Sequence, residues 1–142
     1  MPKVVETQSF TNSKNIADWV KTNLQSTGSP WSLVYTAGTA DASIYYFSNG
    51  LYTIAIGGAR TNTTVEGTTL SSAYLYLKLV KTKNADGTET PTGQTLFSDS
   101  LSFPSSQTWL LVYTPNAVVF RCSEMNKTYG FATISPATDI SS

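Results

Sequence analysis

The apolar residues that follow Pro30 alternate with polar ones along short runs, and turn residues separate the runs. A period of two places one side of a strand against a core and the other side toward solvent. Such runs occur at residues 31–36, 42–48, 51–56, 72–80, 108–113, 117–122 and 128–134. Short turns favour antiparallel pairing, and no βαβ pattern is present. We therefore expect a mainly β fold, an antiparallel β-sandwich or curved sheet of about seven strands.

Two turns in this pattern predict hairpins. Asn49-Gly50 separates two aromatic runs, and this dipeptide readily adopts the two positive φ angles of a type I′ turn. Thr114-Pro115-Asn116 predicts a second tight turn between two apolar strands. Within residues 72–80, three leucines alternate with tyrosine and lysine, so we expect the leucines to face the core.

One amphipathic helix is predicted at about residues 13–25. Ser13 is a suitable N-cap, because its hydroxyl can accept a free N–H of the first turn. Gly28-Ser29-Pro30 prevents helical continuation. The apolar stripe that should pack on the protein's own sheet consists of Ile16, Trp19, Val20 and Leu24.

The length of 142 residues fits a single domain, 1–142. We expect the helix at about 13–25, a β region at about 31–134 and a short C-terminal tail. The segments 57–70 and 81–106 are rich in Gly, Ser and Thr, and we expect surface loops there. Loops of this size are frequent places for binding.

Several chemistries are excluded by composition. The chain has no histidine and one cysteine, so it lacks the imidazole of a Ser-His or Cys-His site and the ligands of a zinc site. The sole cysteine, Cys122, follows an apolar run and is expected to be a small buried residue. Ser-Lys and paired-carboxylate hydrolysis remain possible in principle, but the acids are scattered among residues typical of solvated loops. We predict no enzymatic activity, no cofactor and no metal.

The net charge of the chain also limits the classes of partner that it can bind. Nine basic and nine acidic residues give a net charge of zero. A nucleic-acid-binding surface needs excess positive charge, so no nucleic-acid partner is expected. The N-terminus lacks the apolar core of a secretion signal, and no run of about 18 apolar residues is present. We expect a soluble chain made in a cytoplasm, without a membrane partner.

Tyrosines provide candidate binding residues. Aromatic residues make up 12% of the chain, and an exposed aromatic sheet face can stack on sugars. The alternative is ordinary cross-strand packing. The candidate interface or ligand residues are Tyr45, Tyr52, Arg60, Tyr74 and Tyr76.

The low content of charged residues indicates that the chain assembles with copies of itself or with neighbouring proteins. Only 13% of residues are charged, about half of the usual quarter. Such a chain has little electrostatic repulsion against copies or neighbours, and interface cores are depleted in Lys, Glu and Asp.

Several short motifs follow one another in a definite order along the chain. They are an amphipathic helix, a Trp-led strand, an aromatic hairpin, a second Trp-led strand, a Val-rich strand and a final Tyr-Gly-Phe strand. The segments are residues 16–20, 31–33, 45–50, 52–57, 109–112, 118–121 and 129–131. This order resembles that of small virion structural proteins of tailed bacteriophages.

The resemblance implies a location in the virion and no catalytic residues. It also implies interfaces with copies of the chain and with other virion proteins. We therefore expect a non-enzymatic structural subunit of the tail or baseplate. The alternatives are a carbohydrate- or cell-surface-binding β-sandwich and a capsid decoration protein.

Overall fold

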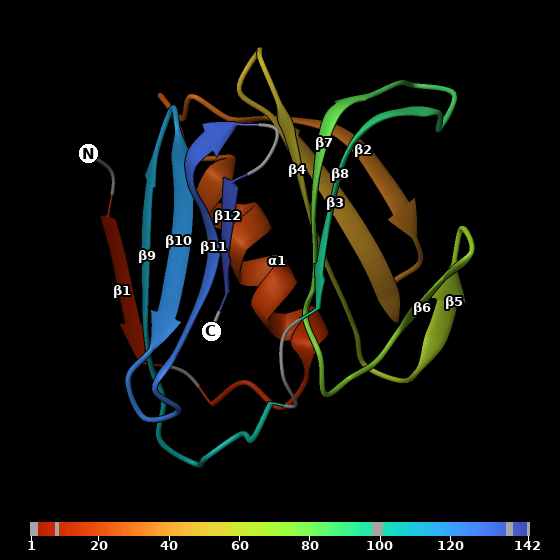
Figure 1. Ribbon diagram of the computed structural model, residues 1–142. Coiled ribbons are helices and arrows are strands. Elements are labelled where there is room, and N and C mark those ends of the chain that lie inside the picture. The colour runs from red at the N-terminus through yellow and green to blue at the C-terminus, as the bar shows by residue number, and fades with distance from the viewer. Residues whose placement is uncertain (1–2, 8, 98–100, 136–137, 142) are drawn as a thin grey trace.

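The fold is an antiparallel sandwich of two five-stranded sheets with one helix between them (Figure 1). The computed structural model describes residues 1–142 except 1–2, 8, 98–100, 136–137 and 142. The β1 sheet has the order β1 (Lys3–Thr7), β9 (Thr108–Thr114), β10 (Ala117–Cys122), β11 (Lys127–Ser135) and β12 (Thr138–Ser141). The β2 sheet has the order β2 (Ser32–Gly38), β3 (Ala42–Ser48), β4 (Thr53–Ala59), β7 (Tyr76–Lys83) and β8 (Glu89–Phe97). The expected mainly β, antiparallel architecture is confirmed.

The strands extend beyond the predicted β region at both ends. β1 precedes the helix, and β12 follows residue 134, where a tail was expected. The segments predicted as loops also contain strands. β5 (Thr63–Val65) and β6 (Thr68–Leu70) form a separate hairpin, and β8 begins at Glu89. These strands are short or rich in Thr and Gly, so apolar alternation does not reveal them.

The helix α1 (Ser13–Leu24) is capped by Asn12 and not, as predicted, by Ser13. The Asn12 side chain accepts a hydrogen bond from the Asn15 backbone N–H at 2.9 Å. The Ser13 hydroxyl is buried instead and joins the helix to the sheet. It donates to the Ser71 carbonyl at 2.8 Å and accepts from the Ala59 N–H at 2.9 Å.

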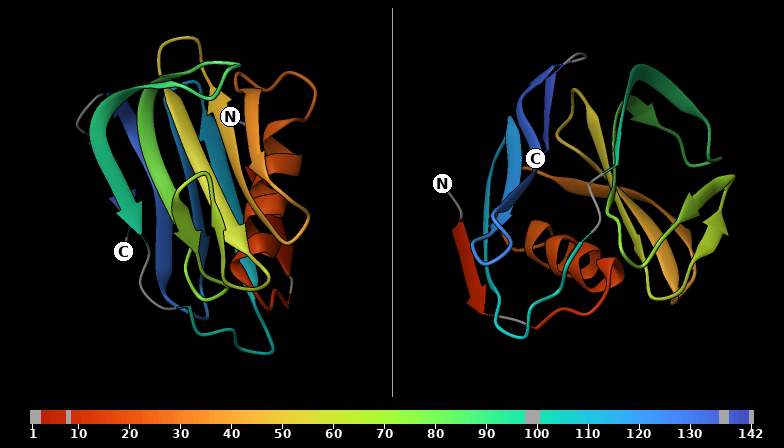
Figure 2. Two further views of the ribbon diagram at one scale, coloured as in Figure 1. Left: turned by 90° about the vertical axis from the view of Figure 1, so that its right-hand side faces the viewer. Right: turned by 60° about the horizontal axis from the view of Figure 1, so that its bottom comes forward.

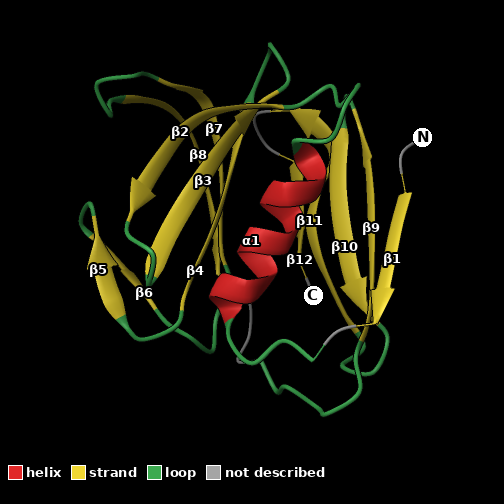
Figure 3. Cartoon of the chain, turned by 180° about the vertical axis from the view of Figure 1, so that it is seen from behind, coloured by secondary structure: helices red, strands yellow, loops and turns green. Residues whose placement is uncertain are grey.

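The core surrounds α1, which lies between the two sheets (Figures 2 and 3). The predicted helical stripe is buried, and the Trp19 ring lies 6.0 Å from the Trp109 ring of β9, centroid to centroid. Phe10 completes this aromatic contact at 6.0 Å from Trp19 and 5.7 Å from Trp109. Cys122 is fully buried, as expected. The leucines of the 72–80 run, Leu75, Leu77 and Leu79, also face this core as predicted.

The Pro115-Asn116 turn is confirmed, since Thr114 pairs with Ala117 across a two-residue loop. The predicted type I′ turn at Asn49-Gly50 is wrong. The last pair of that hairpin is Ser48 with Thr53, which leaves a four-residue loop. In this loop Gly50 has φ +96°, and the Asn49 side chain accepts from the N–H groups of residues 51 and 52. This hydrogen bonding is that of an Asx turn.

Gly58 of β4 permits the close approach of the helix. A Cβ atom added there would lie 2.4 Å from the backbone carbonyl of Ser13. We expect Gly58→Ala to lower the free energy of unfolding by about 3 kcal/mol, because backbone on both sides must move. Gly67→Ala is the control, since its Cβ would meet no atom within 4 Å although φ is +83°. Its expected cost is about 1 kcal/mol. Urea unfolding measures both, and equal losses would contradict the steric explanation.

Candidate functional site

The five candidate residues do not gather on one face. Tyr45 points toward α1 and belongs to the main core, with Tyr52 packed at its margin. Tyr76 lies on the opposite face of the β2 sheet, in a second apolar cluster. Tyr74 is 41% exposed just before β7, and Arg60 is exposed after β4. Their role as interface residues stays a prediction.

Tyr45 is held by polar partners of the helix. Its hydroxyl donates to Asp18 Oδ1 and accepts from Lys14 Nζ at 3.1 Å. Lys14 also pairs with Asp18 at 2.7 Å. Burial raises the pKa of the Tyr45 hydroxyl, and the hydrogen bond to Asp18 raises it further. This triad fastens α1 to β3.

The outer face of the β2 sheet carries a cavity of about 250 Å³. Its floor includes Tyr46 of β3 and Tyr76 of β7. One side is the β5–β6 hairpin, and the other is the turn between β7 and β8. The structure thus brings together Tyr76, a predicted site residue, with charged side chains that the sequence analysis did not select.

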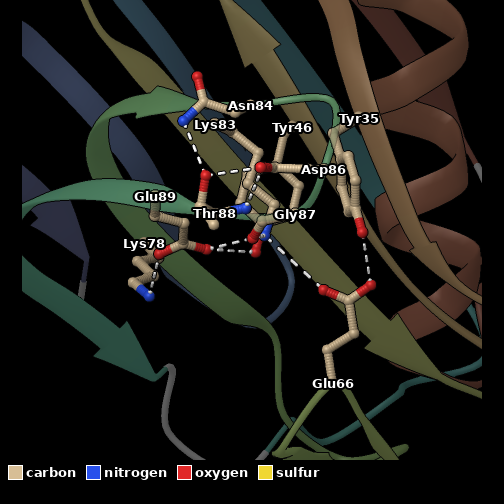
Figure 4. A network of polar contacts seen from close by, with 10 residues as sticks. All are labelled: Tyr35, Tyr46, Glu66, Lys78, Lys83, Asn84, Asp86, Gly87, Thr88 and Glu89. Carbon is tan, nitrogen blue, oxygen red and sulfur yellow. Dashed lines mark hydrogen bonds and ion pairs between the residues drawn. The ribbon is translucent and has the colours of Figure 1, made fainter.

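Lys83 is the centre of the polar network beside this cavity (Figure 4). Its side chain is only 3% exposed. The Nζ atom lies 2.9 Å from the Gly87 carbonyl, 3.1 Å from Glu89 Oε2 and 3.7 Å from Glu66 Oε1. An ammonium group loses its hydration on burial, and this is costly unless other polar groups bind it. The three oxygen partners bind the ammonium of Lys83 and so allow its burial.

Two tyrosine rings complete the surroundings of Lys83. The Nζ atom lies 4.5 Å from the ring centroid of Tyr35 and 4.4 Å from that of Tyr46. The same tyrosines bind the carboxylates. Tyr35 donates to Glu66 Oε2 at 2.8 Å, and Tyr46 donates to Glu89 Oε2 at 3.0 Å. Cation–π attraction and charge-assisted hydrogen bonds therefore act on the same groups.

Glu89 receives donors on both oxygens. Lys78 Nζ contacts Oε1 at 2.7 Å, whereas Lys83 and Tyr46 contact Oε2. Burial alone would raise the pKa of Glu89, but the hydrogen bonds from Lys78, Lys83 and Tyr46 outweigh it and lower the pKa. Burial would lower the pKa of Lys78, yet its bond to Glu89 and the neighbouring Tyr76 keep that pKa raised. The carboxylate and the ammonium both stay charged.

The two tyrosine hydroxyls on the floor of the cavity remain protonated. Burial and the adjacent Glu89 carboxylate raise the pKa of Tyr46. Burial also raises the pKa of Tyr76, whose hydroxyl is hydrogen-bonded to the Thr68 side chain. Both hydroxyls therefore keep their proton near neutral pH, and Tyr46 already donates its proton to Glu89.

Local turn chemistry positions the two hairpins. Glu66 and Gly67 have φ angles of +46° and +83°, which is the type I′ pattern, and they place Glu66 at the tip of β5–β6. In the other hairpin the Asp86 carboxylate accepts from the Thr88 N–H at 3.0 Å. It also accepts from the Thr88 hydroxyl at 2.7 Å. This turn directs the Gly87 carbonyl toward Lys83.

Two carboxylates meet at Lys83. Glu66 and Glu89 both contact one ammonium, contrary to the expectation that the acids lie apart in solvated loops. A general acid needs a raised pKa, and that of Glu89 is lowered. Over the part of the chain that the structure describes, no three His, Cys, Asp or Glu residues are grouped as metal ligands.

A larger hollow, of about 480 Å³, lies between β1 and α1. It is lined by one side of the helix, including Asp18 and Trp19, and by Glu6 and Phe10. Asp18 is already engaged by Lys14 and Tyr45. The cavity on the outer face of the β2 sheet has more polar side chains held in place by hydrogen bonds and ion pairs than this hollow has.

Comparison of the chain with family models, with curated proteins and with solved structures finds no match. Among the described residues, the single helix is too short to cross a membrane.

The network predicts a pH-dependent contribution to stability. Because the pKa of Glu89 is lowered on folding, its stabilising effect is complete above the unfolded pKa of about 4.3 and is lost as pH falls through the folded pKa. We expect Glu89→Gln to lower the free energy of unfolding by about 2 kcal/mol at neutral pH. The difference from the wild type should shrink below about pH 4.

Urea unfolding at a series of pH values measures this difference. Asp41→Asn is the control, because Asp41 is exposed and should change stability by less than about 0.5 kcal/mol. A difference between wild type and Glu89→Gln that persists unchanged in acid would contradict the assignment.

Proposed function

We propose that this chain is a non-enzymatic structural subunit of a bacteriophage virion, in the tail or baseplate. It acts through interfaces with copies of itself and with neighbouring structural proteins. The observation that carries the assembly part of the proposal is the uncharged edge strand β2. The virion location is supported by the order of sequence motifs described above.

β2 lies at one edge of its sheet, and among the residues that the structure describes it pairs with β3 alone. Its sequence, SLVYTAG, contains neither a charged residue nor a proline. The other edge strands of the two five-stranded sheets differ: β1 contains Lys3 and Glu6, β8 contains Glu89 and Pro91, and β12 contains Asp139. The strands β5 and β6 also lack charge and proline, but each of them has only three residues. Edge strands of monomeric proteins usually carry such residues, because an unprotected edge pairs with other chains.

The side chains of β2 suit an interface. Val34 is 40% exposed, and Tyr35 beside it is half-buried. The register against β3 shifts between Leu33 and Tyr35, and the pairing from Tyr35 to Gly38 is then regular. A strand added along the regular stretch from Tyr35 to Gly38 would gain backbone hydrogen bonds and lie beside Val34. The low overall charge reduces the electrostatic cost of bringing copies together.

Substitution of the edge tests self-association. Val34→Lys places a charge on β2, and we expect it to weaken association by about tenfold or more. Leu51→Lys is the matched control, since Leu51 is 69% exposed in the β3–β4 loop, away from any edge. Sedimentation or light scattering over a range of concentrations measures the mass. A wild-type chain that stays monomeric throughout, or equal effects of both variants, would contradict the role of β2.

The location is tested on particles. Antibody labelling and mass spectrometry of purified virions should detect the chain at a fixed copy number, with the label at the tail or baseplate. Because a structural subunit stays bound during purification, a chain that is lost from intact particles would overturn the proposal.

A further inference from the structure

We propose that the cavity on the outer face of the β2 sheet binds a neutral sugar residue. The proposal does not rest on self-association through β2 or on the virion location, although Tyr35 of β2 is hydrogen-bonded to Glu66 of the cavity. Of the candidate residues expected from the sequence it uses only Tyr76, which lies with Tyr46 on the floor of a cavity and not on an exposed tyrosine face.

The size of the cavity limits the ligand. Its volume of about 250 Å³ is just below the range of about 300–1,000 Å³ that is typical of pockets for drug-sized ligands. It is also far larger than the space of roughly 30 Å³ that one water occupies. A ligand with the dimensions of a single sugar ring fits between these limits.

The lining of the cavity carries no net charge and favours neither anions nor cations. Lys78 and Lys83 contribute two positive charges, and Glu66 and Glu89 contribute two negative ones, so the sum is zero. An anion would approach the carboxylates, and a cation would approach the ammonium groups. Neither kind of ion gains net Coulomb attraction here.

The mixture of donors and acceptors favours hydroxyl groups. Lys78 and Tyr76 supply donors, whereas Glu66 and Glu89 supply acceptors. Sugar hydroxyls both donate and accept, so they can use both kinds of partner. Lys78 and Glu89 are 24% and 19% exposed, and Glu66 is 45% exposed, so a ligand can reach all three. Ile44, Tyr46 and Tyr76 are at most 4% exposed, so a ligand would contact mainly the polar side chains of the cavity.

The site is already organised. Lys83 is nearly inaccessible and acts as a positioning residue, because it fixes Glu66 and Glu89 relative to Tyr46 (Figure 4). A ligand therefore does not have to order these side chains on binding, which lowers the entropy cost.

NMR titration of the ¹⁵N-labelled chain tests the proposal. The probes are D-glucose, D-galactose, D-mannose and N-acetyl-D-glucosamine, with inorganic phosphate as an ionic comparison. We expect saturable shifts from at least one sugar, with a millimolar Kd, centred on β5, β6 and β7. An array of immobilised glycans separates recognition of a glycan end from recognition of the free monosaccharide.

Two threonines of β6 provide a matched pair of variants. Thr68 lines the cavity, whereas Thr69 is exposed and is hydrogen-bonded to Thr64. Thr68→Phe should fill the cavity and weaken sugar binding by about tenfold or more, and Thr69→Phe should leave it unchanged. If Thr68→Phe does not fold, Tyr76→Phe removes one hydroxyl and should weaken binding by about fivefold. Tyr113→Phe is its control, because the Tyr113 hydroxyl binds Ser26 elsewhere.

Three results would overturn the site. These are no saturable binding of any probe sugar or arrayed glycan, binding of phosphate in preference to sugars, or binding unaffected by the cavity variants. A chain that assembles through β2 but binds no sugar would refute this inference and leave the proposed assembly intact. The reverse result would refute only the assembly.

Discussion

The close contact between the first turn of α1 and β4 determines how the two sheets share one core. Gly58 leaves room for the helix backbone, and the buried Ser13 hydroxyl joins Ala59 to Ser71. With its first turn fixed there, α1 directs Ile16, Val20 and Leu24 into the space between the sheets. Each of these side chains is fully buried. One helix thus replaces the direct sheet-to-sheet packing of a simple sandwich.

Much of the fold could be predicted because the spacing of apolar residues along the sequence shows which side chains are buried. The helical stripe, the leucines of the 72–80 run and the hairpin around Pro115-Asn116 were all readable in this way. The cap of α1 was predicted one residue late, because Asn12 and Ser13 are both suitable caps and only the sheet contact of Ser13 distinguishes them. The β5–β6 hairpin escaped prediction since its strands have three residues each and are rich in threonine.

The site was harder to predict than the fold. Glu66, Lys83 and Glu89 lie in polar segments, and such residues are usually solvated. These three side chains meet only because two hairpins fold over the same face of a sheet. No local sequence pattern predicts that arrangement. One signal was present: Tyr76 and Lys78 alternate with the core leucines, and this placed them on the opposite face of β7. The Glu66-Gly67 turn shows that a type I′ geometry formed where the sequence contained no Asn-Gly pair.

The burial of Cys122 has a practical consequence. It is the sole cysteine of the chain, it is fully buried in β10, and burial raises the pKa of its thiol. The thiolate is the nucleophile that attacks a thiol reagent, so Cys122 can react only when β10 separates from the core. The rate at which such a reagent labels the native chain therefore measures how often the sandwich opens, without any engineered reporter.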